Sequence, residues 1–460
     1  MSIKILPTHS WRNEFKATMK LAWPLIISQL AGILLFTTDV VMMGWLGPKY
    51  LAAGTLATSL LHPLFIGSIG VLSATAPLIA QAIGAKRIKD VRRIVRQGFW
   101  VSLVLALIII PIFFSANSIF LFLGQNEEIS QMAQTYLYFA SGSVLPGLMF
   151  IALRSLLQVR GAVMVILYIT IGGIFINAFG NYALMFGNFG FPRLELAGAG
   201  ISTSFVNLIM FLFILSFVLF HRKYKRFYVL YRLFKPDWER FFQLFKLGIP
   251  IGLTIMSEIG MFSIAVIMMG WLGTNEVAAH AIALQCAAIA FMLPLGLSQA
   301  TTVRVGLFAG AKNLNGIKKA GWTSFLITIF FMSITSALFI FAPSLLIGLF
   351  LSPLKPENLI VIPLAISYLG IAALFQFVDG AQVIMAASLR GLSDTKIPMF
   401  IAIFGYWVFG IGIAYYAAFN LEMRGVGVWI GLASGLGFVA IALSLRFLMR
   451  ERLGLLDNIK

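Results

Sequence analysis

The sequence predicts an all-α polytopic membrane protein, with about twelve transmembrane helices in two pseudo-symmetric six-helix bundles. The first observation is composition: 60% of the 460 residues are hydrophobic and only 11% are charged, outside the range of soluble globular domains. The second is that apolar runs of about 20 residues recur along the whole chain, each long enough as a helix to cross a bilayer. A β-barrel would show short alternating segments instead and is excluded.

The third observation is an internal repeat at an offset of 226 residues. Residues 21–47 read LAWPLIISQLAGILLFTTDVVMMGWLG, and residues 247–273 read LGIPIGLTIMSEIGMFSIAVIMMGWLG. The repeat aligns Pro24 with Pro250, and each proline predicts a helix bend because it removes a backbone hydrogen bond. Since six spans is an even number, both halves enter the membrane from the same side and are parallel repeats.

The apolar runs and the repeat together predict how the chain is divided. The expected spans are residues 20–46, 51–83, 97–122, 130–155, 162–187, 197–220, 245–270, 278–308, 318–350, 358–388, 396–418 and 426–448. They form a first lobe of six helices at residues 1–225, a cytoplasmic linker at 226–245 and a second lobe of six helices at 246–460.

The basic residues are distributed unevenly between the two sides of the membrane. A net charge of +18 is also typical of nucleic-acid-binding proteins, but the placement of the charges argues against that class. With the N-terminus inside, the external loops hold only four of the 34 Lys and Arg, namely Lys49, Arg193, Lys355 and Arg424. This bias predicts that both termini are cytoplasmic. The longest basic segment, His221 to Lys246, is foremost a topology signal, and contact with anionic lipid head groups is a weaker addition.

Three acids are the principal candidates for function. Of sixteen acids, only Asp39, Glu258 and Asp379 lie inside apolar spans. A charge at this depth costs at least ~3 kcal/mol, so an intramembrane carboxylate indicates a functional site unless it is a structural acid bonded to a neighbour. Glu258 lies twelve residues from Lys246 and Asp379 eleven from Arg390, which places both near the midplane, at ~18 and ~17 Å.

The first lobe offers a second polar group nearer the outside. Asp39 lies nineteen residues from Lys20, or ~28 Å, and Asn177 seventeen from Arg160, or ~26 Å. Asn177 and Asn181 share a helix face at i, i+4, so they can join Asp39 in one oxygen-rich cluster. The alternative for the two asparagines is interhelical hydrogen bonding.

The acids of the two lobes fall on one stripe of the repeated helix. Asp39 is seven residues from Gly32, the position equivalent to Glu258, so the two differ by about 20° around the helix. A shared stripe predicts that both acids face a central cavity, and Gln29, Gln376 and Gln382 are expected around it.

The remaining polar residues suggest no reaction. His62 and His280, near helix starts, are expected to be structural, and Arg304 is expected to snorkel from an inner helix end. No phosphate-binding G-x-x-x-x-G-K-[ST] loop, Cys/His cluster or Ser/His/Asp set occurs, so we expect neither an enzyme nor a bound cofactor. The single cysteine, Cys286, excludes an intramolecular disulfide.

Several motifs resemble the NorM branch of the MATE (multidrug and toxic compound extrusion) family. They are the repeated MMGWLG, SEIG at 257–260, AAHAIALQ at 278–285, PLGLSQA at 294–300, and Asp379-Gly380 followed by LRGLSDT at 389–395. The resemblance covers nearly the whole chain. It implies a V-shaped pair of six-helix bundles that exports cationic and amphiphilic drugs by alternating access, driven by Na⁺ or H⁺. It also implies a cation-binding acid pair at Glu258 and Asp379, where Na⁺ is a possible ligand, and a first-lobe site at Asp39, Asn177 and Asn181.

The resemblance slightly favours Na⁺ over H⁺ as the coupling ion, whereas buried carboxylates alone fit both. The expected partners are small organic cations and membrane lipids, with no nucleic acid, and the expected state is a monomer in a bacterial-type inner membrane. One alternative is a flippase for lipid-linked precursors in the same superfamily, which needs basic residues in its cavity. Another is an intramembrane enzyme, which lacks a recognisable catalytic set.

Overall fold

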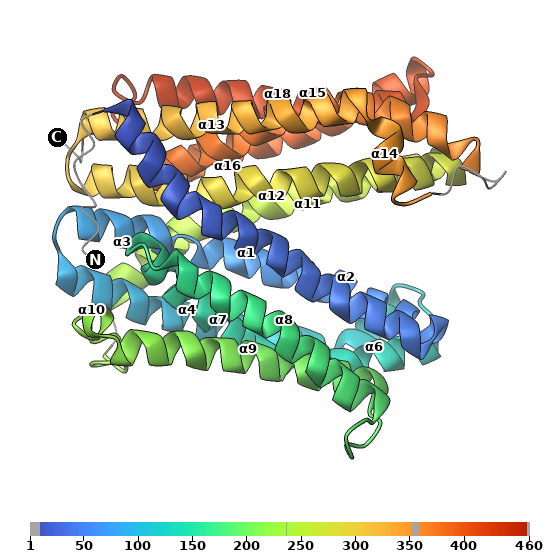
Figure 1. The fold of residues 1–460 in the computed structure, drawn as a ribbon, viewed down its shortest axis with the longest axis horizontal. Coiled ribbons are helices and arrows are strands. Elements are labelled where there is room, and N and C mark those ends of the chain that lie inside the picture. Colours follow the sequence, from blue (N-terminus) through green and yellow to red (C-terminus); the bar gives the residue numbers. More distant parts are fainter. Residues whose placement is uncertain (1–9, 236, 352–357, 458–460) are drawn as a thin grey trace. The chain divides into compact units, whose positions relative to one another are not determined.

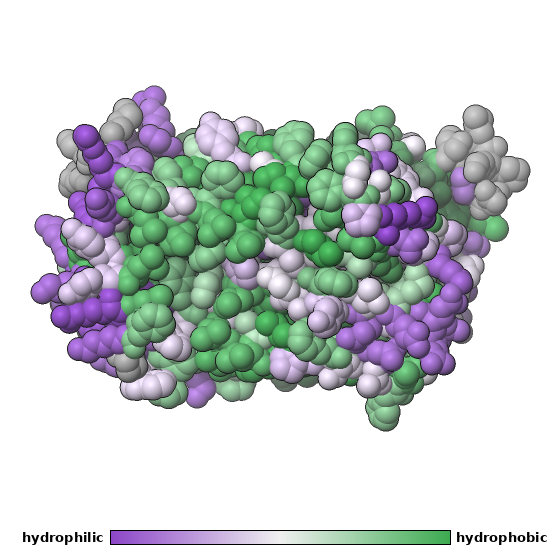
Figure 2. Space-filling model, turned by 90° about the horizontal axis from the view of Figure 1, so that it is seen from below, coloured by the Kyte–Doolittle hydropathy of each residue, from purple (hydrophilic) through white to green (hydrophobic). Residues whose placement is uncertain are grey.

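The computed structural model describes residues 10–235, 237–351 and 358–457, and every regular element within these ranges is helical (Figure 1). Twelve of the described helices are long and apolar enough to cross a membrane, so the predicted number of spans is confirmed. Figure 2 shows one face of the molecule, where hydrophobic side chains fill the middle and hydrophilic side chains gather at both ends. This is the surface pattern of a protein that spans a bilayer.

The spans form two successive sets of six along the chain. The first set is α1 (Trp11–Leu46), α2 with α3 (Pro48–Leu72 and Thr75–Gly84), α4 (Ile88–Phe114), α6 with α7 (Glu127–Ala140 and Val144–Val159), α8 (Val163–Phe186) and α9 (Glu195–Phe220). The second set is α11 (Trp238–Leu272), α12 (Thr274–Gly310), α13 (Leu314–Phe341), α15 (Val361–Gly391), α16 through η4 (Lys396–Asn420) and α18 (Arg424–Leu448). The short α10 (Arg222–Lys225) lies between the two sets, just before the expected linker.

Two expected spans are too long, at equivalent places in the repeat. The helix expected at 97–122 ends at Phe114, and the short α5 (Ala116–Phe122) follows. The helix expected at 318–350 ends at Phe341, and the short α14 (Pro343–Gly348) follows. In the second half the cause is local, because Pro343 lacks an amide hydrogen and begins a new helix.

The turn after the repeated MMGWLG motif is the same in both halves. Gly47 has φ +133° and Gly273 has φ +135°, values that a residue with a side chain rarely adopts. Each glycine comes directly before the next span, at Pro48 and Thr274. The repeat therefore holds at the level of backbone conformation as well as sequence.

The contacts group the chain into two compact units whose limits differ from the covalent repeat. One unit contains Ile27–Gly252, and the other contains the described residues up to Ile26 together with those from Leu253 onwards. The expected division at 225 and 246 follows the repeat. The units instead divide α1 and α11 two residues after Pro24 and Pro250, at equivalent positions. Each unit thus contains the first turns of the helix that opens the other half.

Close backbone contacts hold the start of α11 in the 27–252 unit and the start of α1 in the other unit. In the 27–252 unit, a side chain at Gly248 of α11 would lie 2.3 Å from the Val71 carbonyl of α2. In the other unit, a side chain at Gly296 of α12 would lie 2.6 Å from Cα of Ile26 in α1. Such contacts are possible only because both positions are glycine.

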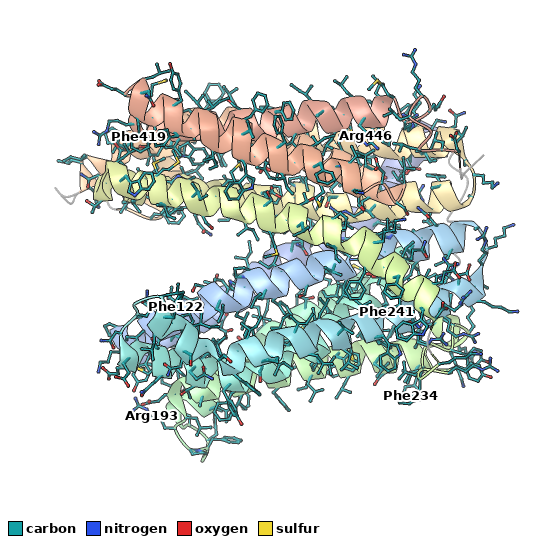
Figure 3. All side chains as sticks on the ribbon, turned by 180° about the vertical axis from the view of Figure 1, so that it is seen from behind. Phe122, Arg193, Phe234, Phe241, Phe419 and Arg446 are labelled. Carbon is teal, nitrogen blue, oxygen red and sulfur yellow. The ribbon has the colours of Figure 1, made fainter. Side chains whose placement is uncertain are left out.

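The described cations that the sequence predicts outside the membrane are all paired with acids. Lys49 bonds to Glu128 at 2.5 Å, Arg193 lies 3.4 Å from Glu195, and Arg424 bonds to Glu276 at 2.8 Å. The fourth expected external cation, Lys355, lies outside the described residues. In the 27–252 unit, Figure 3 shows Phe122 and Arg193 at one end and Phe234 and Phe241 at the other.

Candidate functional site

The carboxylates of the second half lie in a hydrogen-bonded group built by three spans. Gln382 of α15 donates from Nε2 to Glu258 Oε1 of α11 over 3.0 Å, and the hydroxyl of Tyr406 donates to Gln382 Oε1 over 2.9 Å. Asp379 lies one turn before Gln382 on the same face of α15, is 7% exposed, and is close enough for the Glu258 charge to act on it. The structure thus brings the two predicted acids together.

One oxygen in this group has no partner. Oδ1 of Asp379 is buried and accepts no hydrogen bond from the described residues. A buried, unsatisfied carboxylate oxygen is unfavourable unless a proton or a cation occupies it for part of the time. The arrangement can therefore hold H⁺, or bind a small cation between oxygens of Glu258, Asp379 and Gln382.

Sequence reasoning missed Tyr406. It lies in η3 (Gly405–Ile411), a π-helical stretch of the eleventh span, and its side chain is fully buried. Such stretches are frequent at functional sites because the extra residue per turn redirects side chains. The only signal in the sequence is a tyrosine inside an apolar span, where its hydroxyl needs a partner.

The predicted first-lobe cluster is assembled in the 27–252 unit. Asn181 of α8 donates from Nδ2 to Asp39 Oδ1 of α1 over 2.6 Å, and the same nitrogen lies 3.5 Å from Asn177 Oδ1. All three side chains are buried, and Asn177 Nδ2 and Asn181 Oδ1 have no hydrogen-bond partner among the described residues. The cluster therefore retains both an acceptor and a donor for a ligand.

Two of the predicted glutamines have other partners. Gln29 accepts a hydrogen bond from Arg154 over 3.0 Å, and Gln376 accepts one from Thr335 over 2.6 Å. Gln382 is the glutamine that bonds to an acid. Pro24 and Pro250 are both buried within helices that continue past them, and their expected role in bending stays a prediction.

The expectation that Arg304 snorkels is wrong. Its guanidinium is buried and makes two bonds to the carboxylate of Glu14, Nε to Oε1 at 2.8 Å and Nη2 to Oε2 at 2.5 Å. Glu14 belongs to the first turn of α1, which packs in the same unit as α12. Because the sequence does not show this packing, the ion pair with Glu14 could not be foreseen, and the sequence instead predicts a side chain that extends to water. His280 is buried against the ring of Trp429, and neither of its ring nitrogens has a hydrogen-bond partner among the described residues, so its expected structural role stays a prediction.

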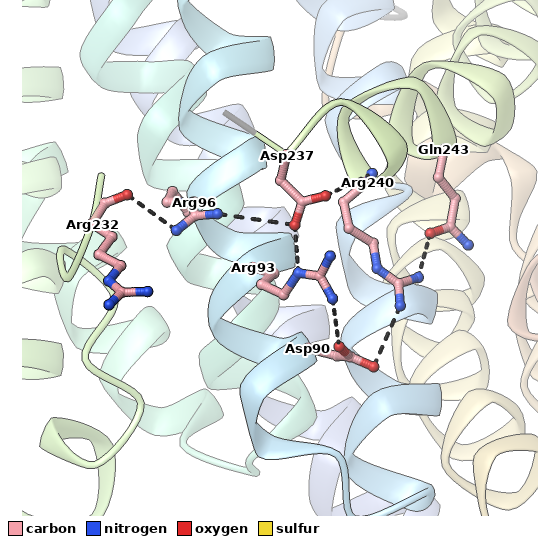
Figure 4. Close-up of polar contacts among 7 residues, drawn as sticks. All are labelled: Asp90, Arg93, Arg96, Arg232, Asp237, Arg240 and Gln243. Carbon is pink, nitrogen blue, oxygen red and sulfur yellow. Dashed lines mark hydrogen bonds and ion pairs between the residues drawn. The ribbon is translucent and has the colours of Figure 1, made fainter. Parts of the chain in front are cut away.

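The equivalent helix start of the second half is also held by ion pairs, with the signs reversed. Arg240 occupies the position 226 residues after Glu14, and its Nη2 lies 3.4 Å from Asp90 of α4. Figure 4 shows this network, in which Asp237 accepts a 2.5 Å bond from Arg93 and lies 3.9 Å from Arg96. The start of α1 and the start of α11 are each packed with the other half of the chain, and ion pairs hold each of them there.

No group of three or more His, Cys, Asp or Glu side chains gathers within the described ranges. The polar groups identified above instead combine one or two carboxylates with amide and hydroxyl groups, inside helices that span a membrane. Buried acids of this kind, turned into a helical bundle, are typical of proteins that move ions or solutes across membranes. The fold and the site therefore define a polytopic helical protein of the transporter class.

The family model described as MatE matches residues 24–183 and 250–416, which fall on the two halves of the repeat, and the chain belongs to this family. It is similar to the "Probable multidrug resistance protein NorM" of Mesorhizobium japonicum, with 41% identity over 452 residues, 97% of this chain and 96% of that protein. The protein of the same description from Pseudomonas putida is 36% identical over 441 residues, 96% of this chain and 95% of its own length.

Solved structures share the fold at low sequence identity. The eukaryotic MATE transporter AtDTX14 superposes with a TM-score of 0.85 at 20% identity, over 98% of this chain and 100% of that chain. A MOP superfamily transporter from Pyrococcus furiosus superposes with a TM-score of 0.83 at 22% identity, over 98% and 99% of the two chains. The predicted family and the predicted fold class are confirmed.

Proposed function

We propose that this protein is a multidrug efflux antiporter that exports cationic and amphiphilic compounds in exchange for Na⁺ or H⁺. The observation that carries the proposal is the buried, unpartnered Oδ1 of Asp379 beside Glu258. The relatives described as multidrug resistance proteins support the choice of substrate class.

The carboxylates couple the two fluxes by competition. A positively charged drug and the coupling ion are attracted to the same negative charges, so binding of one favours release of the other. Coupling also requires that the ion binds the inward-facing and outward-facing states with different affinity. Hydrogen bonding of Gln382 to Glu258 helps to fix the geometry in which the two acids act together.

We further propose that the chain is a monomer in a bacterial inner membrane, with both termini in the cytoplasm and bilayer lipids around its apolar surface. The charge bias supports this orientation, because the basic residues concentrate at the loops on one side. The flippase alternative is not favoured. Arg304, a cation within the spans of the second half, is neutralised by Glu14 and is not available to hold a pyrophosphate.

Transport of ethidium in proteoliposomes tests the proposal, with a Na⁺ gradient and a pH gradient imposed separately. We expect Glu258→Gln and Asp379→Asn each to lower the rate at least about tenfold, which corresponds to ~1.4 kcal/mol. The matched control is Glu128→Gln, which neutralises an exposed external acid. Normal transport in both site variants would refute the assignment of the acids. Transport driven by Na⁺ at constant pH would identify Na⁺ as the coupling ion, and transport driven only by the pH gradient would identify H⁺.

A further inference from the structure

An apolar groove runs between α8 and α9 where α9 approaches the linker. It has a volume of about 470 Å³ and is lined by Val165, Ile169, Phe213, Ser216, Phe217, Phe220 and His221. Helix α9 is among the least covered of the spans, since only 17% of the residues in its most apolar stretch are buried. Phe213 is 61% exposed and Phe220 81% exposed. In a membrane, the groove therefore faces lipid rather than protein of the described chain.

A basic turn follows directly at the end of the groove. Residues 222–226 read RKYKR, and their four cationic side chains are exposed while Tyr224 is buried. The Tyr224 ring lies 5.4 Å from that of Phe217 and 5.4 Å from that of His221, two residues that line the groove. Tyr224 thus fixes the basic turn against the groove wall, and the cations stay beside its open end.

The charges of Arg222, Lys225 and Arg226 are not balanced by acids of the neighbouring sequence. No Asp or Glu occurs between Glu195 and Asp237, and none occurs between Glu128 and Glu195, so α7, α8 and most of α9 contribute no acid. Asp237 is itself held by Arg93 and Arg96. Arg160, which directly follows α7, adds another cation, because its guanidinium and that of Arg226 lie 5.7 and 5.4 Å from the ring of Phe227. The turn therefore attracts an anion.

Exposed aromatic side chains continue along the linker. Tyr228 is 58% exposed, Phe234 83% and Trp238 62%. Aromatic side chains combined with Lys and Arg are typical of segments at the boundary between head groups and acyl chains. A soluble anion would satisfy the basic turn alone, whereas a phospholipid satisfies the turn, the groove and the aromatic side chains together.

We propose that the α8–α9 groove and the basic turn form a binding site for one anionic phospholipid of the cytoplasmic leaflet. An acyl chain occupies the groove, and the phosphate contacts the cations of Arg222, Lys225 and Arg226. The site is specific to the first half. The residues of the second half that are equivalent to 222–226 are 448–452, which read LMRER, and there Glu451 lies 4.0 Å from Arg450. The preceding Arg446 of α18 is paired with Asp394 by bonds of 2.6 and 3.2 Å.

Native mass spectrometry of the purified full chain tests this site. The protein is titrated with phosphatidylglycerol or with phosphatidylcholine of the same acyl chains. We expect the first phosphatidylglycerol to bind about tenfold more tightly than phosphatidylcholine, because charge-assisted contacts to the phosphate and a negative net charge act together. The double variant Arg222→Gln/Arg226→Gln should lose this preference and bind both lipids alike.

Two further variants separate a built site from general electrostatic attraction. Arg87→Gln/Lys89→Gln removes two exposed cations at the start of α4 and should leave the preference unchanged. Ser216→Phe fills the groove and should weaken binding of both lipids. The proposal is overturned if the wild type does not distinguish the two lipids. It is also overturned if the loop variant loses the preference as fully as the basic-turn variant, or if filling the groove has no effect. Ethidium transport by each variant verifies that it is folded.

Discussion

Arg304 and Glu14 show how a single charged residue is accommodated inside a span. Both side chains are almost inaccessible to solvent, and the guanidinium also lies 4.8 Å from the ring of Phe308. Removing one partner leaves a buried charge, which typically costs about 3–5 kcal/mol, whereas replacing both is often nearly neutral. We therefore expect Arg304→Met to lower the free energy of unfolding by about that amount, measured by chemical unfolding in detergent micelles.

The double variant provides the control for this pair. Glu14→Gln/Arg304→Met removes both charges and should recover most of the stability lost in Arg304→Met. The pair would not be the source of the effect if the double variant lost as much free energy of unfolding as Glu14→Gln and Arg304→Met lose together.

Tyr406 is the residue through which the eleventh span reaches the carboxylate pair. Tyr406→Phe removes the hydroxyl that orients Gln382, a hydrogen bond worth ~1 kcal/mol, so we expect about fivefold slower ethidium transport. The matched control is Tyr416→Phe in the same span, since Tyr416 is 58% exposed. Equal rates in the two variants would show that the bond to Gln382 does not affect transport.

At the scale of elements, α18 packs against the eleventh span backbone to backbone. Side chains added at Gly427, Gly431 and Gly435 would lie 2.5, 2.3 and 2.6 Å from backbone atoms of that span. This four-residue spacing of small residues is a common way for membrane helices to approach closely. The interface therefore has no room for even one methyl group.

Gly431→Ala tests this interface. We expect it to lower the free energy of unfolding by about 1–3 kcal/mol, because neither backbone can move aside. Gly412→Ala in the eleventh span is the matched control, since nothing lies within 4 Å of the added methyl group. Alanine favours helix over glycine by ~1 kcal/mol, so the control should be neutral or stabilising. A stable Gly431→Ala protein would contradict the close packing.

The network that joins the start of α11 to α4 has a predictable dependence on pH. Burial raises the pKa of Asp237, but the hydrogen bonds from Arg93 and the Arg240 backbone and the charges of Arg93 and Arg96 outweigh it, so the pKa falls below the ordinary 3.8. A lowered folded-state pKa stabilises the protein above pH 3.8, and this contribution is lost as pH falls through the folded-state value.

Asp237→Asn isolates this contribution. At pH 7 the wild type should melt at a higher temperature than the variant, and the difference should shrink as the pH approaches 3. Melting temperatures in detergent at a series of pH values provide the measurement. A difference that stays constant over this range would show that the carboxylate charge is not responsible.

At the scale of the whole molecule, we predict the orientation in the membrane from the distribution of charge. Cys286 is the single cysteine and is buried, so Cys286→Ser provides a background for labelling introduced cysteines. We expect Gln125→Cys to react with a membrane-impermeant maleimide in intact cells, and Lys89→Cys to react only after the cells are opened. Both positions are exposed, so the reverse pattern would mean that the protein is inserted the other way round.

Much of this architecture could be predicted because it depends on local pattern. Apolar length predicts the spans, and the i, i+4 spacing of Asn177 and Asn181 with the depth of Asp39 predicts their meeting. The Glu14–Arg304 pair could not be predicted, because it depends on which unit the start of α1 packs in. The bond from Tyr406 depends on a π-helical turn, which leaves no periodic signal in an apolar span.

The exchange of helix starts between the two units also affects the order of synthesis. The 27–252 unit is complete only after Gly252 has been made, well into the second repeat. The first turns of α1 are made first, yet Arg304 and Gly296 of α12, which they contact, are made nearly three hundred residues later. The first repeat therefore cannot finish folding before part of the second has been made. Two fragments divided at the linker would each lack a helix start that the other carries.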